Sequence, residues 1–256
     1  MLNKWFLRGV FATLFILPGL CHAQSTAEPD LQSLLSAFVS YTDLRTSSVQ
    51  QSLEILASTS EVKSGKWETM KGLLNVYQQS DSGLVVWYAR PDGSYFTVEK
   101  GLMDAKLSDR SYFPDLVEGR KINGALVVSK STGQRSAVIA VPVKDGSKVV
   151  GAIGASLFLD RLSDQISATL ALRSDAAFFA LAPNGLTTLH RKTDRHFLDP
   201  RELGSETLKK AANEMLSKTS GETTYEFDNV TKTAIYRTSP LTQWKFAITS
   251  NAVARK

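Results

Sequence analysis

A long stretch without proline near the N-terminus is the feature that most constrains the fold. Between Leu31 and Tyr77 there is no proline, and apolar residues recur at spacings of three and four. This spacing predicts amphipathic helix. Ser58–Glu61 has the pattern of a capping box that starts a second helix. We therefore predict that residues 24–80 form a long helical region whose apolar stripes pack against a core.

The pattern changes to strands and turns in residues 81–172. Asp92-Gly93 separates two β-rich runs, which is a strong signal for a hairpin. Two further hairpins are expected to turn at Ser131–Gln134 and at Asp145-Gly146. Asp160 is predicted to cap a helix that leaves this unit.

Residues 173–256 repeat the theme more briefly. A strand, the turn Pro183–Gly185 and another strand precede a predicted helix from about Ser205 to Leu216, and three more strands follow. Strands and helices in this order indicate an α+β fold. We expect two PAS-like units behind the N-terminal helix, each an antiparallel sheet with flanking helices.

The first 23 residues indicate export. Lys4 and Arg8 precede the apolar run Val10–Leu20, and Ala23 is a suitable residue before a cut. This layout predicts a cleaved signal peptide over residues 1–23 and a periplasmic protein. Two alternatives are lipidation at Cys21 and an uncleaved segment that anchors the chain in the inner membrane. No later run reaches the roughly 18 apolar residues of a membrane-spanning helix.

Several function classes find no support in the sequence. The formal net charge is only +5, and no block of Lys and Arg with interleaved aromatics appears, so no nucleic-acid partner is expected. Gly-x-Ser-x-Gly is absent, and Gly151–Gly154 lacks the third glycine of a dinucleotide-binding loop. We predict no catalytic residues and no cofactor.

A segment with two histidines offers candidate metal ligands. His190 and His196 lie near Asp194 and Asp199, but three basic residues in the same segment would repel a cation. We predict no metal. The segment is interpreted as a solvated loop, with the alternative that His190 faces a small pocket in the second unit.

Arg110, Tyr112 and Phe113 are the strongest candidates for a binding site. A guanidinium offers two parallel donors to a carboxylate, and aromatic faces shield such a pair from water. The same residues are equally compatible with a surface salt bridge beside two core aromatics, and chemistry alone does not separate these interpretations.

Several segments in order carry a family resemblance. They are Trp87–Gly93, Asp109–Phe113, Ser129–Gly133, Ile139–Val143 and Val149–Gly154. Together they resemble a Cache (PDC-type, PAS-like) extracellular sensor domain, and the long helix and second unit suggest its double form.

The resemblance implies a ligand site in the first, membrane-distal unit. Arg110, Tyr112 and Phe113 match the pocket motif, Ser129 and Ser131 match inward-pointing positions, and Trp87 lies on the facing strand. Ser156 stands near the place where an aspartate would hold an ammonium group. The expected ligand is therefore a small carboxylate or an uncharged polar metabolite.

The chain reaches Lys256 without an output domain. We therefore expect a sensor that acts through a membrane-bound partner, which would be a sensor kinase, a cyclase or a chemoreceptor, with a homodimer formed through the N-terminal helix. One alternative is a partner-binding protein with a degenerate pocket, in which the helical face bearing Leu34, Phe38 and Tyr41 makes the contact. A less favoured alternative is a periplasmic hydrolase that uses generic carboxylates and His190.

Overall fold

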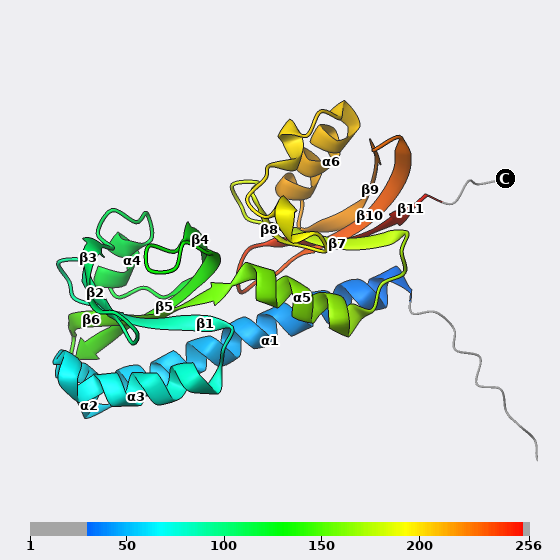
Figure 1. Ribbon diagram of the computed structural model, residues 1–256. Coiled ribbons are helices and arrows are strands. Elements are labelled where there is room, and N and C mark those ends of the chain that lie inside the picture. Colours follow the sequence, from blue (N-terminus) through cyan, green and yellow to red (C-terminus); the bar gives the residue numbers. More distant parts are fainter. Residues whose placement is uncertain (1–29, 253–256) are drawn as a thin grey trace, which may run out of the picture.

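The computed structural model describes residues 30–252, so the predicted signal peptide at residues 1–23 lies outside the described residues. Helix α1 (Leu31–Ser58) is 28 residues long. It begins after Asp30, whose carboxylate accepts a 2.7 Å hydrogen bond from the Ser33 N–H. Figure 1 shows that α1 runs beneath both units of the protein.

The predicted second helix is divided in two. α1 is followed by α2 (Ser60–Lys63) and α3 (Trp67–Ser80). Thr59, and not Ser58, caps α2, because its hydroxyl accepts the Val62 N–H at 3.4 Å. The predicted capping box is therefore wrong by one residue. Gly65, at φ +66°, lies in the break between α2 and α3, a conformation that glycine adopts without strain.

The first unit is a six-stranded antiparallel sheet in the order β3-β2-β1-β6-β5-β4. The predicted hairpins at Asp92-Gly93, Ser131–Gln134 and Asp145-Gly146 are confirmed, whereas edge strand β3 was not expected from the sequence. Short helix α4 (Phe113–Val117) lies between β3 and β4 in the chain. The strands are β1 (Leu84–Ala89), β2 (Ser94–Thr97), β3 (Gly101–Lys106), β4 (Ile122–Val128), β5 (Arg135–Asp145) and β6 (Lys148–Phe158).

The second unit is a five-stranded antiparallel sheet in the order β8-β7-β11-β10-β9. Two 3₁₀ turns, η1 (Thr193–Arg195) and η2 (Pro200–Glu202), and helix α6 (Glu206–Ser217) connect β8 to β9. The strands are β7 (Ala176–Leu181), β8 (Thr187–His190), β9 (Ser220–Phe227), β10 (Val230–Thr238) and β11 (Lys245–Asn251).

The two sheets share one connectivity. In each unit the first strand lies between the second strand and the last strand: β1 between β2 and β6, and β7 between β8 and β11. A helix, α4 or α6, precedes the return to the far edge of the sheet. This arrangement confirms the prediction of an α+β fold with two PAS-like units behind a long helix.

Helix α5 (Leu159–Leu170) follows directly from β6. The prediction that Asp160 caps this helix is wrong: the N-cap position belongs to Phe158, which offers no side-chain cap. Asp160 lies inside the first turn, and its carboxylate instead contacts Nδ1 of His196 at 2.8 Å. The Asp160 carboxylate therefore pairs with a distant residue of the second unit instead of capping its own helix.

One apolar core joins α1 to both sheets. Near the start of α1, Phe38 packs edge-on against Phe178 and Phe246 of the second unit, with ring centroids 5.0 and 4.8 Å apart. Further along, Leu53 belongs to the same buried cluster as the inner residues of β5 and β6. The interpretation of the apolar stripes as core contacts is confirmed, and Phe38, fully buried, is not available to an external partner.

The units also touch each other directly. Gly124 in β4 lies beside Trp244, which precedes β11, and a Cβ at this glycine would stand 3.0 Å from the indole. Its φ of +96° accompanies a shift of register between β4 and β5. A glycine here therefore allows both the bulge and the close approach of the second unit.

Candidate functional site

The structure brings three of the predicted site residues together in the first unit. Trp87, Tyr112 and Phe113 are buried in one apolar cluster on the face of the sheet away from α1. Trp87 lies opposite Gly154 of β6, where a Cβ would stand 2.2 Å from the indole. The indole therefore occupies the space that a side chain at position 154 would need. In this state the aromatic residues fill the face that was predicted to hold a ligand.

Arg110 lies at the edge of this cluster. One terminal nitrogen of its guanidinium donates a 2.7 Å hydrogen bond to the Val128 carbonyl. Its Nε is buried and has no hydrogen-bond partner within residues 30–252. Neighbouring Asp109 is already paired with Lys130 at 2.6 Å. Arg110 thus retains a buried donor beside aromatic side chains, and among the described residues it does not form the surface salt bridge that was the alternative interpretation.

Tyr112 is the most strongly desolvated phenol of this group. Burial raises the pKa of its hydroxyl well above the ordinary value of 10.0, although the nearby positive charge of Arg110 lowers it in part. The hydroxyl is therefore protonated at every pH at which the protein is expected to work. It is a neutral group that donates or accepts hydrogen bonds and carries no negative charge.

The three predicted serines are placed differently. Ser129 and Ser131 lie in the β4–β5 turn, with their hydroxyl oxygens 3.1 Å apart. Ser129 also accepts the Thr132 N–H, so it supports the turn. Ser156 is buried in β6 between Val85 and Val138 of the neighbouring strands. The described residues show no hydrogen bond between any of these serines and Arg110.

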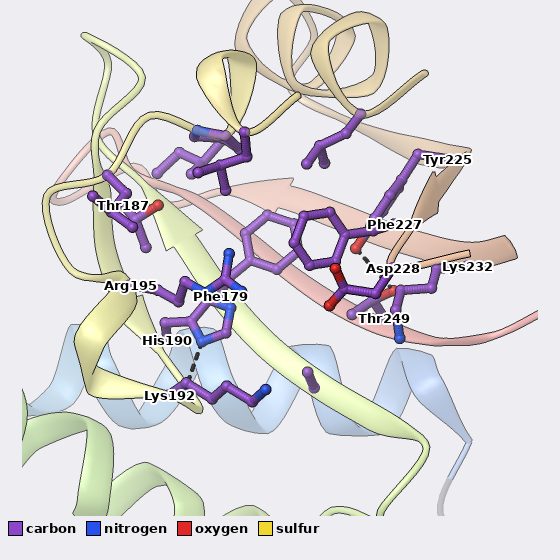
Figure 2. Close-up of a pocket in the computed structure, with 16 residues that line it drawn as sticks. Phe179, Thr187, His190, Lys192, Arg195, Tyr225, Phe227, Asp228, Lys232 and Thr249 are labelled. Atoms are coloured by element: carbon purple, nitrogen blue, oxygen red, sulfur yellow. Dashed lines mark hydrogen bonds between the residues drawn. The ribbon is translucent and has the colours of Figure 1, made fainter. Parts of the chain in front are cut away.

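A pocket of about 170 Å³ lies in the second unit. Figure 2 shows its aromatic and charged residues, which come from β7, β8, the turns that follow β8, and the β9–β10 hairpin. The alternative expectation that His190 faces a small pocket is confirmed. Its apolar lining includes Phe179, Leu181, Leu198, Leu208, Tyr225 and Phe227.

The charged residues of this pocket were not predicted. Lys192, Arg195 and Lys232 line it together with a single carboxylate, Asp228. The Arg195 guanidinium lies over the Phe227 ring, 5.1 Å from its centroid. The sequence offered little signal for this grouping, because the residues come from separate turns that only the folded sheet brings together.

His190 is held in one tautomer. Its Nδ1 accepts the Lys192 N–H at 2.7 Å, so in the neutral ring Nε2 carries the proton. Burial, followed by the positive charge of Arg195, lowers the pKa of His190 to about 4. At neutral pH the ring is therefore an uncharged donor stacked on Phe179, with centroids 6.4 Å apart.

Asp160, His196 and Ser163 form a chain of hydrogen bonds that resembles a catalytic triad. His196 Nδ1 contacts Asp160 at 2.8 Å, and Nε2 contacts the Ser163 hydroxyl at 3.0 Å. However, Ser163 is only 1% exposed and His196 is fully buried, and the Ser163 hydroxyl also accepts a hydrogen bond from the backbone N–H of His190. A nucleophile needs access to its substrate. The chain instead fastens the η1 turn to α5.

Two further properties follow from residues 30–252. Within this range no three His, Cys, Asp or Glu residues are grouped in a way that would hold a metal ion. Nor does any helix in the same range have the length and apolar character needed to cross a bilayer.

Comparisons with known proteins place this fold. No family model matches the chain, and no curated protein matches it in sequence. The sensory domain of the Campylobacter jejuni chemoreceptor Tlp3, with isoleucine bound, has a TM-score of 0.64 at 13% identity, covering 87% of this chain and 91% of that chain. An extracellular ligand-binding receptor from Desulfohalobium retbaense has a TM-score of 0.71 at 14% identity, covering 88% and 41%.

A third similar structure is the extracellular domain of rpHK1S-Z16, described as a histidine kinase. Its TM-score is 0.69 at 16% identity, covering 87% of this chain and 93% of that chain. These similar structures are sensory and ligand-binding domains rather than enzymes. At such identities the likeness establishes the fold alone, a long helix followed by two PAS-like α+β units.

The depressed pKa of His190 makes stability depend on pH. In the unfolded chain His190 takes up a proton near its ordinary pKa of 6.5, whereas in the folded protein it does so only near 4. As pH falls through this window the unfolded state binds more protons, so the free energy of unfolding decreases, by about 3 kcal/mol at most.

We expect His190→Asn, whose amide oxygen can still accept the Lys192 N–H, to lose this share of the pH dependence. Urea unfolding at pH 7, 6, 5 and 4 measures it. The difference between the two proteins should change progressively between pH 6.5 and 4, and parallel profiles would contradict the assignment.

Proposed function

We propose that this protein is a periplasmic sensor module that binds a small carboxylate or polar metabolite in its first unit. The observation that carries the proposal is the buried Nε of Arg110, which has no partner within residues 30–252 and lies beside Tyr112 and Phe113. Leaving a buried donor without a partner is costly, and an anionic or polar ligand would satisfy it.

Ligand entry requires the aromatic cluster to rearrange. Tyr112 precedes α4 and Phe113 is its first residue. Backbone hydrogen bonds from Arg110 N to Leu107 O and from Phe113 N to Arg110 O hold the segment that joins β3 to this helix. A ligand that pairs with Arg110 would favour the conformer in which this segment moves outward, by the difference in its affinity for the two states. In this scheme the moving segment is the part of the first unit that responds to the signal.

The sensor is proposed to act on a membrane-bound partner: a sensor kinase, a cyclase or a chemoreceptor. Support comes from the fold, which is shared with the extracellular domains of a chemoreceptor and of a protein described as a histidine kinase. A sensor that acts on such a partner transmits its state only if the partner binds the liganded and free forms with different affinity.

A thermal-shift panel of carboxylates, amino acids, polyamines and nucleobases tests the first-unit site. A ligand at about 100 times its Kd adds about 2.7 kcal/mol to the free energy of unfolding, which raises Tm by several degrees for a chain of this size. The shift should disappear in Arg110→Ala. It should persist in Arg120→Ala, a matched control at a surface arginine paired with Asp115 and Glu118.

Two results would count against this function. One is a panel without any ligand. The other is a panel in which the shift of every ligand survives intact in Arg110→Ala.

The second candidate function is contact with another protein through α1, including a homodimer. Leu44 and Ile55 are 69% and 68% exposed, and their spacing of 11 residues is close to three helical turns, so they share one face. Two exposed apolar side chains on one helix face offer a partner apolar area that is favourable to remove from water.

We expect Leu44→Glu combined with Ile55→Glu to convert a dimer to a monomer in analytical ultracentrifugation, because it buries two charges at the interface. Val76→Glu on α3, at a residue that is 66% exposed, is the matched control and should leave the assembly intact. A wild-type protein that sediments as a monomer at all accessible concentrations would rule out the homodimer.

A further inference from the structure

The pocket of the second unit combines an apolar interior with surplus positive charge. Its lining contains three cationic side chains and one carboxylate. Figure 2 shows Arg195 and Lys192 on one side, together with His190, and Asp228 and Lys232 on the other. Because the surplus is positive, the pocket favours a ligand with net negative charge.

Arg195 is the cation best placed to pair with a ligand. Within residues 30–252 it forms no ion pair, and its described contact is the cation–π stacking on Phe227. Arg201 of the same unit, in contrast, is already committed to Asp199. Lys232 is partly committed, since its Nζ donates to the Asn251 side chain at 3.2 Å. The donors of Arg195 therefore remain available inside a partly apolar site, where a charge-assisted bond is strong.

The position of Arg195 is fixed by its neighbour. His196 is fully buried and bonded to both Asp160 and Ser163 of α5. The backbone that carries Arg195 is therefore tied to a helix, and less ordering remains to be done when a ligand binds. A second donor stands beside it: the Nε2–H of His190, whose Nδ1 is held by the Lys192 N–H.

The volume limits the body of the ligand. A dry cavity of about 150 Å³ lined by apolar side chains is large enough for benzene. At about 170 Å³, this pocket accommodates one ring or a short branched chain against its aromatic wall.

We propose that the second unit carries a binding site of its own, for a small carboxylate with a branched aliphatic or single-ring body. Arg195 pairs with the carboxylate, His190 donates to it, and Phe179 and Tyr225 contact the body. Asp228 repels the carboxylate and thereby restricts its orientation. The site is independent of Arg110, which lies in the other sheet.

Isothermal titration of the purified protein with a matched series tests the proposal. The probes are 4-methylpentanoate, its uncharged amide, and leucine, which is the same acid with an added ammonium group. We expect the acid to bind and the amide to bind at least tenfold more weakly, because a charge-assisted bond is lost. Leucine should also bind more weakly than the acid, since its ammonium group meets three cations and one carboxylate.

Three variants separate the site from general damage to the fold. Arg195→Gln should weaken binding of the acid about tenfold to a hundredfold. Asp228→Asn should tighten binding several-fold by removing a like charge, a gain that structural damage would not produce. Lys209→Gln, an exposed residue of α6 outside the pocket, is the matched control for a lost positive charge and should leave the affinity unchanged.

Several outcomes would overturn the proposal. Equal affinity for the acid and its amide removes the role of charge, and tighter binding of leucine removes the preference for a net anion. Binding that is lost in Arg110→Ala but kept in Arg195→Gln would assign the acid to the first unit. If neither 4-methylpentanoate nor a single-ring acid such as phenylacetate binds, the second unit lacks the proposed site.

Discussion

The packing of one helix against two sheets is the interaction on which the rest of the structure depends. Phe38 of α1 meets Phe178 and Phe246 of the second sheet, and Leu53 of the same helix is buried with the first sheet. A partly buried hydrogen bond reinforces this joint: the Ser239 hydroxyl donates to Asp43 of α1 at 2.6 Å, and desolvation raises the pKa of that carboxyl. Each sheet completes its core only with α1 present. A change in the position of one unit therefore also changes the packing of the helix that supports the other unit.

The two units use their remaining faces differently. In the first, Trp87 lies against Gly154 and aromatic neighbours occupy the face, so that a polar group, Arg110 Nε, is left without a partner in the described residues. In the second, the connection from β8 to β9 stands away from the sheet and leaves a pocket. The hydrogen bonds of His196 attach this connection to α5, which follows directly from the last strand of the first unit. The wall of the second-unit pocket is thus attached by hydrogen bonds to α5, and α5 continues the chain from the first unit.

Features set by neighbouring residues were predictable from the sequence. The Asp92-Gly93 turn and the helix that starts after Ser205 depend on local geometry, and both are present.

Features set by distant partners were not predictable from the sequence. Asp160 has the residue type of a helix cap, but His196, 36 residues away, takes its carboxylate. The split between α2 and α3 depends on the left-handed Gly65, whereas Gly72 remains helical, and spacing alone does not separate these two glycines. The Arg110 cluster was found from its residue types, while the charged lining of the second pocket comes from separate turns and has no local pattern.

Native-state hydrogen exchange of Phe38→Ala tests the central claim most directly, namely that α1 joins the two units into one cooperative structure. Phe38 is fully buried and touches aromatic residues of the second sheet. Its truncation is expected to cost about 3–5 kcal/mol. The account predicts that amides of β5 and β6 in the first unit lose protection by the same free energy as those of β7 and β11, while Val76→Ala at an exposed position of α3 changes neither. Loss of protection confined to β7 and β11 would contradict it, because the two units would then be independent in stability.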